Sequence, residues 1–509
     1  SSVSFVPGLT FPASAYSIPG AMLPSSEWNP GMLFGWRWRD RFYNDSPMEM
    51  ASQIGLLNGE PILYANSPEV AKQLLGNKAP FDKLKESVQS LSPFGPNVFA
   101  TMSAEWPRHQ TAMSPGFNGR LYSSVWTETK KTYYDFLTTE KWENEREFIM
   151  PDVTAVTSKF ALYLIAKCGF GIDLSWNEDV GERIRGMSLP ECFEITSSSV
   201  LILSFLSHWT YSLPIPALRR LYNASNILET IFKGIIDKRR VEGFGNTSED
   251  KDIFSLLLAA NELEKGSKGA LSDRELVSNV FLLLLAGHGS STLLNVFLLL
   301  LAGHETTSKS LAATLGELAC NPEVQQHAYD EIMSVIKEGS DPTLDDFEKL
   351  PFVQGCFQEA LRMYPTAHVL MRRPVEDTVL QVPSRQGGVV PLSVPSGQVV
   401  ALDFFGIGYN ARVYKDPKSF NPARWLDPAT EPLLNFSYGP RVCIGKKFAV
   451  VEVTGVLALL LRDYKVEPIL KDGQTIADWH AAWVENVEAV IGFGHKRFPL
   501  KFTRRSVRA

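Results

Sequence analysis

Cysteine is scarce in this sequence of 509 residues, and the five cysteines present are scattered. They lie at Cys168, Cys192, Cys320, Cys356 and Cys443. No two of them have CxxC spacing, and an odd number cannot pair completely. The set therefore argues against a disulfide framework and favours a reducing compartment, in which the first four are ordinary buried thiols.

The sequence also lacks a Gly/Ser-rich linker and any shift of composition that would divide it. Its length alone would allow two or three domains. Without a visible boundary, we expect one large domain. The formal net charge is −6, with 44% apolar and 21% charged residues. Because the balance is acidic, we expect no nucleic acid as a general partner.

Two sequence signals for cofactor and membrane segments are missing. No GxGxxG motif follows a strand-like segment, so no flavin- or nicotinamide-binding domain fits in the chain. No run of about 20 apolar residues stands near the N-terminus. The first 45 residues are instead rich in Pro, Gly and Trp, with Trp36-Arg37-Trp38 as the most aromatic stretch. Trp and Arg suit a membrane interface, and a surface loop is the alternative interpretation.

Cys443 lies within residues 436–445, which read FSYGPRVCIG, and a helix-like run follows from Lys446. The Gly-Pro pair at 439–440 predicts a tight turn, so Cys443 lies at or just before a helix N-terminus. Backbone N–H groups and the helix dipole there favour a thiolate, which is a soft metal ligand. Arg441 can reach a carboxylate or phosphate on the same ligand. A buried structural cysteine before a core helix is the alternative.

The pattern Phe-x-x-Gly-x-Arg-x-Cys-x-Gly at 436–445 resembles the haem-ligand loop of the cytochrome P450 family. Chance matches to all five fixed positions are rare. The resemblance implies that Cys443 is the axial thiolate of haem b, where it favours O–O cleavage. It also implies that Arg441 pairs with a haem propionate and that Phe436 packs beside the sulfur. Gly445 would let the backbone pass close to the flat ring.

A ten-residue sequence, NVFLLLLAGH, occurs twice, starting at Asn279 and at Asn295, an offset of 295 − 279 = 16 residues. On one continuous helix, steps of about 100° would turn the two copies to nearly opposite faces. The chain therefore reads as a family member with a 16-residue tandem duplication over 279–310. The duplication could loop out near 287–291 or damage the site. A membrane span over 280–303 is an alternative that the Gly- and Ser-containing middle disfavours.

The second copy continues into Glu305-Thr306, whereas the first continues into Gly289-Ser290. The second is similar to the family's Ala/Gly-Gly-x-Asp/Glu-Thr motif on the long helix that crosses the haem. That resemblance implies that Thr306 stabilises bound oxygen and water, that Glu305 helps to relay protons, and that the preceding Ala-Gly pair leaves room for O2. A structurally neutral threonine that bonds back to the preceding turn is the alternative.

Glu359 and Arg362 are three residues apart on a predicted helix and can pair. Such a pair is common, but this one precedes Tyr-Pro and lies 443 − 359 = 84 residues before the cysteine. It resembles the invariant pair of the same family. The resemblance adds Arg424, in the segment FNPARW, as the third member of a Glu-Arg-Arg network. We expect these three residues to be structural rather than chemical.

The family usually carries Trp-x-x-x-Arg on one helix face, where both side chains touch the haem propionates. This sequence has Trp106 but carries Gln110 at the arginine position. Arg108 or His109 could substitute, or Gln110 could donate a neutral hydrogen bond. A solvated helix end is the alternative.

For the other propionate, Arg372 is the first choice and Arg373 the alternative. By the same resemblance, residues 81–105 would roof the substrate pocket and 189–217 would form a lid. The last hairpin is expected over 487–501.

The resemblance covers nearly the whole chain and is closest to fungal, microsomal-type (class II) members. It implies a mainly α fold with small β-sheets, in which haem lies between a long central helix and the cysteine-loop helix. Residues 1–45 would be a proline/tryptophan-rich segment after a membrane anchor, and 46–509 a single catalytic domain. The expected location is the cytoplasmic face of the endoplasmic reticulum membrane, with the anchor outside this chain.

The implied function is a haem-thiolate monooxygenase that inserts one oxygen atom of O2 into an apolar organic substrate. A separate NADPH–cytochrome P450 reductase, with cytochrome b5 as a further donor, would supply electrons and dock near Lys446 and Lys447. Two alternatives remain. One is a haem-thiolate isomerase or peroxygenase that needs no electrons, and the other is an inactive haem-binding paralogue caused by the duplication.

Overall fold

The computed structural model describes most of the chain. The described residues are 6–14, 20, 25–58, 60–85, 97–99, 101–103, 105–176, 186–188, 191–192, 195–196, 213–242, 253, 301–337, 340–489 and 492–505.

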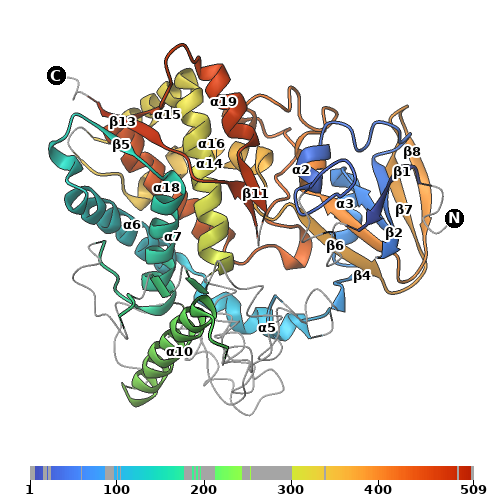
Figure 1. Cartoon of the computed structure of the whole chain (residues 1–509), viewed down its shortest axis with the longest axis horizontal. Coiled ribbons are helices and arrows are strands. Elements are labelled where there is room, and N and C mark those ends of the chain that lie inside the picture. Colours follow the sequence, from blue (N-terminus) through green and yellow to red (C-terminus); the bar gives the residue numbers. More distant parts are fainter. Residues whose placement is uncertain are drawn as a thin grey trace.

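The structure has a helical part and a part built around a six-stranded sheet, seen on the left and right of Figure 1. The sheet order is β1-β2-β3-β9-β6-β4, with parallel pairs β1/β2 and β3/β9 and antiparallel pairs elsewhere. The strands, in chain order, are β1 (Gly8–Ala13), β2 (Met50–Asn58), β3 (Ile62–Ala65), β4 (Phe81–Asp82), β6 (Val369–Pro374) and β9 (Val399–Asp403). Two short helices of the N-terminal region and one beyond β9 accompany them, namely α2 (Phe34–Trp38), α3 (Pro68–Leu75) and α17 (Phe404–Gly408).

The helical part carries the main hydrophobic core. Its helices are α6 (Gly119–Thr139), α7 (Val153–Phe170), α14 (Thr306–Cys320), α15 (Pro322–Val335), α16 (Pro351–Met363), α18 (Lys446–Asp463) and α19 (Ile476–Glu485). Two further helices, α5 (Trp106–Met113) and α10 (Pro216–Glu242), lie at the lower edge of the view in Figure 1. The helices α14 and α18 are buried along most of their length, which is typical of helices at the centre of a large domain.

Among the residues that the structure describes, three smaller sheets complete the fold. One has the order β10-β13-β5, and the other two are the pairs β7-β8 and β11-β12. Their strands are β5 (Glu147–Met150), β7 (Thr378–Pro383), β8 (Val389–Val394), β10 (Tyr464–Pro468), β11 (Val487–Ala489), β12 (Phe493–His495) and β13 (Leu500–Arg504). The expected mainly α fold with small β-sheets is therefore found.

The hairpin expected over 487–501 is shorter than predicted. β11 and β12 pair from Val487↔His495 to Ala489↔Phe493, but Leu500 onward joins β10 and β5. The reason is burial, because Phe502 is fully buried and stacks on Phe148 at a centroid distance of 5.3 Å.

The N-terminal aromatic stretch is part of the fold. Trp36 is 1% exposed, and Trp38 packs edge-on against Phe11 of β1. Neither the interfacial position nor the surface loop expected for these two tryptophans is found, because their rings fill the core beside the sheet. Trp28, in contrast, is largely exposed.

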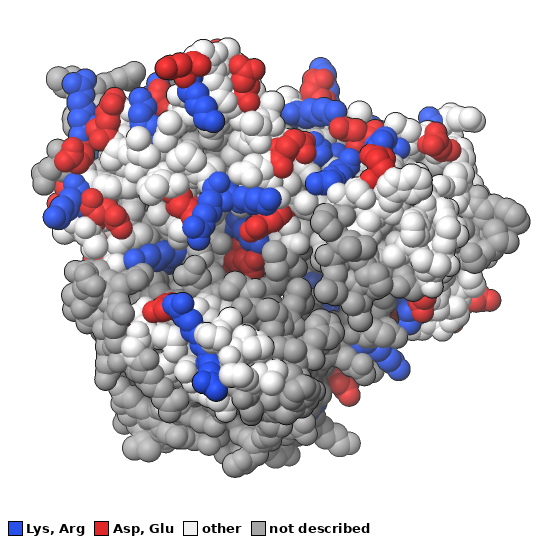
Figure 2. Space-filling view, viewed as in Figure 1, with Lys and Arg blue, Asp and Glu red and all other residues white. Residues whose placement is uncertain are grey.

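The first copy of the repeat lies outside the described residues, as do the second copy up to residue 300 and most of the predicted lid at 189–217. Within the described part of the chain, no helix combines the length and apolarity needed to cross a membrane. On the face seen in Figure 2, positive and negative side chains are interspersed over the described surface.

Candidate functional site

The cysteine loop has the predicted turn. A single 3₁₀ turn spans Gly439–Arg441, and Gly439 has φ +70°. A Cβ at Gly439 would lie 2.3 Å from the carbonyl oxygen of Leu75, so only glycine fits this backbone. The Cys443 N–H donates to the carbonyl of Phe436 at 2.8 Å. This bond closes the loop three residues before α18 begins and confirms the predicted position of the cysteine at a helix N-terminus.

The backbone N–H groups act on Cys443 as expected, since the hydrogen bonds from Gly445 and Lys446 lower its pKa. Burial raises the pKa of Cys443, and this effect outweighs the backbone hydrogen bond from Gly445 and the charge of Lys446. Yet Cys443 has exposed surface. A positive partner beside the sulfur would be needed to hold a thiolate there.

Three cationic side chains meet near this loop. They are Arg441, Arg372 of β6 and Lys83, which directly follows β4. The two strands pair antiparallel with Phe81 opposite Pro374 and Asp82 opposite Arg373. Continuing that register sets Lys83 opposite Arg372.

The pKa values of the three cations show that they are crowded. Burial and then the charges of Arg441 and Arg372 lower the pKa of Lys83 to about 6. Burial and then Arg441 lower the pKa of Arg372 to about 10. Burial also lowers the pKa of Arg441. Asp82 is the carboxylate that opposes all three shifts. Three basic side chains therefore share one described carboxylate, and the lowered pKa of Lys83 leaves that side chain largely neutral at pH 7.

Arg441 is held by a hydrogen bond through one nitrogen of its guanidinium and has a second nitrogen without a partner among the described residues. Its Nη1 donates to the carbonyl of Thr101 at 2.7 Å. Its Nη2 is buried and has no hydrogen-bond partner among the described residues. Its guanidinium lies 5.2 Å from the ring centroid of Trp106. The structure thus brings together two residues that the sequence predicted for one propionate site.

The structure also separates the two candidates for the other propionate. Arg372 is 6% exposed and belongs to the cation cluster. Arg373 points to Glu60, with an Nη2–Oε2 distance of 2.7 Å. Arg372 is therefore the better candidate. His109 is fully buried on α5, and Trp106 is the residue of that helix placed against Arg441.

These residues fit haem b. The guanidinium groups of Arg441 and Arg372 match the charges of the two propionate groups, and the buried Nη2 of Arg441 lacks the acceptor that a carboxylate would supply. The sulfur of Cys443 is the ligand type that haem iron takes in a thiolate site. Gly445 leaves the loop open, because a Cβ there would meet nothing nearer than the Cys443 sulfur at 3.9 Å.

The Glu-Thr motif lies at a change of helix type. Residues Leu301–Glu305 form a π-helical turn, and α14 starts at Thr306. Such turns widen a helix and are frequent at functional sites. Gly303 faces α7, since a Cβ there would touch Ile165 at 3.6 Å. The role of this glycine in leaving room for O2 stays a prediction.

Glu305 is held in an ion pair. Its Oε1 lies 2.6 Å from Nζ of Lys309, one turn later. The same Nζ donates to the carbonyl of Gly492 at 2.9 Å. A proton-relay role for Glu305 would thus include Lys309, a residue that no sequence motif had indicated.

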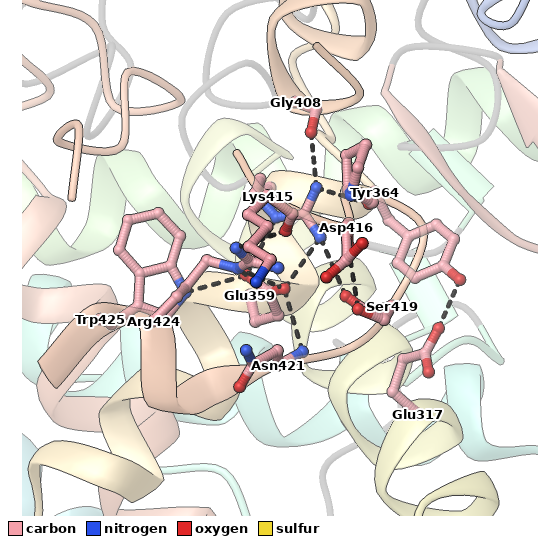
Figure 3. Close-up of polar contacts among 12 residues, drawn as sticks. Glu317, Glu359, Tyr364, Gly408, Lys415, Asp416, Ser419, Asn421, Arg424 and Trp425 are labelled. Atoms are coloured by element: carbon pink, nitrogen blue, oxygen red, sulfur yellow. Dashed lines mark hydrogen bonds and ion pairs between the residues drawn. The ribbon is translucent and has the colours of Figure 1, made fainter. Parts of the chain in front are cut away.

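The Glu-Arg-Arg network is confirmed (Figure 3). Glu359 accepts two hydrogen bonds from Arg362, one from Nε to Oε2 at 2.9 Å and one from Nη2 to Oε1 at 2.8 Å. Arg424 Nε lies 2.9 Å from Glu359 Oε1. The indole N–H of Trp425 and the backbone N–H of Asn421 also donate to Glu359, each at 3.0 Å. Neither of these two residues was predicted in this role from the sequence.

Arg362 also fixes the backbone at Gly408. The Gly408 carbonyl accepts from Arg362 Nη1 at 2.5 Å, and a Cβ at Gly408 would lie 2.3 Å from the backbone oxygen of Arg362. This backbone therefore excludes a side chain at position 408.

Lys83 is the site residue that sequence reasoning missed. Its sequence neighbours gave no motif, and only the pairing of β4 with β6 brings it beside Arg372. A lysine within a segment expected to be apolar was the one available signal.

Comparison with known proteins identifies a family. The cytochrome P450 family model matches residues 56–301 and 290–487, and these two segments overlap over 290–301, which includes the start of the second copy of the repeat. Cytochrome P450 monooxygenase 124 of Postia placenta is 30% identical over 508 residues, covering 98% of this chain and 94% of its own. Human cytochrome P450 4F12 is 28% identical, in an alignment that covers 77% of this chain and 72% of the human protein. Cytochrome P450 monooxygenase prx9 of Penicillium rubens is 23% identical, in an alignment that covers 86% of this chain and 79% of the fungal protein.

Proposed function

The chain belongs to the cytochrome P450 family and is a monooxygenase with haem b as cofactor, and we propose that Cys443 is the cysteine that ligates its iron. The observation that carries this assignment is the position of Cys443. Cys443 is exposed just before α18, in the loop that also carries Arg441 of the cation cluster. The other four cysteines lack such a setting, since Cys168, Cys192 and Cys356 are buried, Cys320 is half-buried and none lies in this loop.

In this proposal, Arg441 and Arg372 hold the two propionates of the haem. Arg441 donates through its buried Nη2, while Trp106 packs on its guanidinium and keeps water away. Phe436 and Gly445 shape the loop around the sulfur, one through its backbone bond to Cys443 and the other through its missing side chain. His109 supports the site from within α5.

When bound, thiolate-ligated haem would catalyse the cleavage of O2, with one oxygen atom entering the substrate and the other leaving as water. The chain's contribution is to deliver protons and position the substrate. Thr306 offers a hydroxyl at the end of the π-helical turn, and Glu305 holds a carboxylate beside it. Lys309 fixes the position of that carboxylate through their ion pair. The substrate class is apolar organic molecules.

Electrons come from a separate NADPH-dependent reductase, with cytochrome b5 as a further donor. The support is that Lys446 and Lys447 are both exposed at the start of α18, three and four residues after Cys443. An acidic partner surface would therefore approach the thiolate side of the haem. The proposed location is the cytoplasmic face of the endoplasmic reticulum membrane, in line with the class II resemblance. The 16-residue duplication over 279–310 stays a prediction.

The test is the absorption spectrum of the reduced, CO-bound protein. We expect a Soret band at the thiolate position in the wild type and its loss in Cys443→Ala. Cys320→Ala, a change of a half-buried thiol, is the control and should keep the band. A wild-type band at the position of histidine-ligated haem would overturn the assignment of Cys443. Substrate turnover that needs NADPH and the reductase would then separate a monooxygenase from an enzyme that uses peroxide.

A further inference from the structure

We propose that Lys309 is a positioning residue that ties the Glu305 carboxylate to the C-terminal hairpin β11–β12, so that the place of this hairpin controls proton delivery. The inference rests on the proposed role of Glu305 as a proton relay. It goes beyond that role because it names a second element, distant in the sequence, on which the relay depends.

Lys309 joins two elements through one ammonium group. Its Nζ lies 2.6 Å from Glu305 Oε1 and donates to the carbonyl of Gly492, just before β12, at 2.9 Å. Both charged side chains are mostly shielded from water, since 13% of the Lys309 side chain and 18% of the Glu305 side chain are exposed. A pair with so little exposure is screened less than a surface pair, and the position of the ammonium therefore sets the position of the carboxylate.

The hairpin leaves space for the stem of this lysine. A Cβ at Gly494 would lie 2.8 Å from Cδ of Lys309 and 2.9 Å from its Cγ. Non-bonded carbon atoms prefer a separation of about 3.5–4.0 Å, so a side chain at position 494 would push the lysine away. The absence of a side chain at Gly494 thus lets Lys309 lie against the backbone of β12.

The hairpin is also fixed to the loop after α16. The Phe493 N–H donates to the carbonyl of Thr366 at 2.8 Å, and a Cβ at Gly492 would lie 2.8 Å from Cγ2 of the same threonine. The Thr366 hydroxyl lies 3.1 Å from that of Ser310, which donates to the carbonyl of Thr306 at 2.8 Å. A chain of neutral contacts therefore links the hairpin to the first turn of α14, beside the charged contact described above.

This arrangement makes the relay carboxylate sensitive to the hairpin. One oxygen of Glu305 is bonded to Lys309, so a shift of the hairpin that moves the ammonium also moves the carboxylate. A general acid or base acts only within hydrogen-bond reach of the proton that it transfers, and a small misplacement lowers the rate strongly. A substrate that packs against the hairpin would therefore change proton delivery.

The experiment breaks the tie from each side and uses O2 as the only substrate of the reductase-supported holoprotein. O2 takes two electrons and two protons to give hydrogen peroxide, and four of each to give two water molecules. The ratio of water to peroxide formed per NADPH therefore reports proton delivery. We expect this ratio to fall about 10-fold in Lys309→Met, which removes the charge, and to fall in Gly494→Ala, which displaces the lysine.

Two controls make the comparison specific. Gly119→Ala is the matched glycine change, because Gly119 is exposed and a Cβ there would meet nothing within 4 Å. It should keep the wild-type ratio. In a Lys309→Ala background, Gly494→Ala should have no further effect, since residues that act through one contact are not additive.

A second readout does not depend on haem chemistry. Hydrogen exchange of the intact protein, followed by mass spectrometry, measures how firmly β12 is held. Peptides that cover Phe493–His495 should exchange faster in Lys309→Met than in the wild type, while peptides of the β7–β8 pair should not change. Unchanged exchange in β12 would overturn the tie.

The outcomes also separate this inference from the proposed function. A wild-type ratio in Glu305→Gln would refute the relay role and with it this inference. A lowered ratio in E305Q beside a wild-type ratio in K309M would refute only the role of Lys309. An equal effect of Gly494→Ala with and without Lys309 would show that the hairpin does not act through this lysine.

Discussion

The two groups of buried basic residues in this molecule differ in how their charges are matched. In the network of Glu359, Arg362 and Arg424, both guanidinium groups bond to the same carboxylate. Arg362 donates further to backbone carbonyls, such as that of Pro417 at 2.8 Å. In the cluster of Lys83, Arg372 and Arg441, three basic side chains share Asp82, whose oxygens are already bonded to backbone N–H groups.

The difference separates a structural site from a ligand site. A buried charge that has its partners within the chain contributes to the folded state without outside help. A buried charge that lacks them destabilises the fold until an anion arrives. The contrast between the two groups lies in the direct bond to a carboxylate, since Arg424 Nη2 is also buried without a hydrogen-bond partner among the described residues. Substitutions in each group, and in a pair of intermediate character, test this distinction.

The largest effect is expected from breaking the matched network. Arg362→Met removes the two hydrogen bonds to Glu359 and leaves backbone carbonyls without their donor. Loss of one partner from a buried charged pair costs about 3–5 kcal/mol, so we expect the free energy of unfolding to fall by that amount. Chemical denaturation followed by circular dichroism measures it.

The control for this change is Lys465→Met, which breaks an exposed pair with Glu467. Exposed pairs contribute about 0–1 kcal/mol, so the control should lie within that range. If R362M were no less stable than K465M, the network would not be structural and the contrast between the two groups would fail.

An intermediate effect is expected from removing a cation of the unmatched cluster. Arg372→Gln deletes a guanidinium that we assign to a haem propionate. Because a hydrogen bond to a charged group contributes about 1.5–3 kcal/mol, haem should dissociate about 10-fold faster or more. Transfer of haem from the intact holoprotein to apomyoglobin measures it. Arg373→Gln, which breaks the pair with Glu60, is the matched control, and equal haem loss in the two variants would mean that Arg372 does not hold a propionate.

The smallest effect on stability is expected for Glu317 and His480. Their charges are opposite only when the histidine is protonated. His480 Nε2 lies 3.1 Å from Glu317 Oε1, which also accepts from the Tyr364 hydroxyl at 2.5 Å. Burial lowers the pKa of His480, but the hydrogen bond and charge of Glu317 outweigh it and leave the pKa raised. A raised pKa stabilises the fold below the pKa of unfolded histidine, and this contribution disappears as pH rises through the folded pKa.

His480→Gln should therefore cost at most about 1 kcal/mol at acidic pH. The cost should shrink as pH rises above the histidine range. Urea denaturation of the wild type and the variant at two pH values measures the difference. A cost that grows with pH would contradict the direction of the pKa shift.

The local features of the fold were predictable because they depend on neighbouring residues. Ser67 caps α3, with its hydroxyl accepting from the Val70 N–H, and Pro68 opens the helix. The turn before Cys443 follows from its glycine and proline in the same way. The burial of Trp36 and Trp38 could not be predicted, because their contacts come from β1 and from residues hundreds of positions away.

The sequence by itself determined the family, the cofactor and the residue types that serve it, since spaced motifs such as FSYGPRVCIG need no tertiary contact to be read. It also limited the charged network to three residues that proved to be partners. Only the tertiary structure decided which arginine, Arg372 or Arg373, joins the site, and that Lys83 lies beside it. The physical reason is that charge matching depends on distance in space. Two strands that pair across nearly 300 residues bring together cations that no local pattern relates.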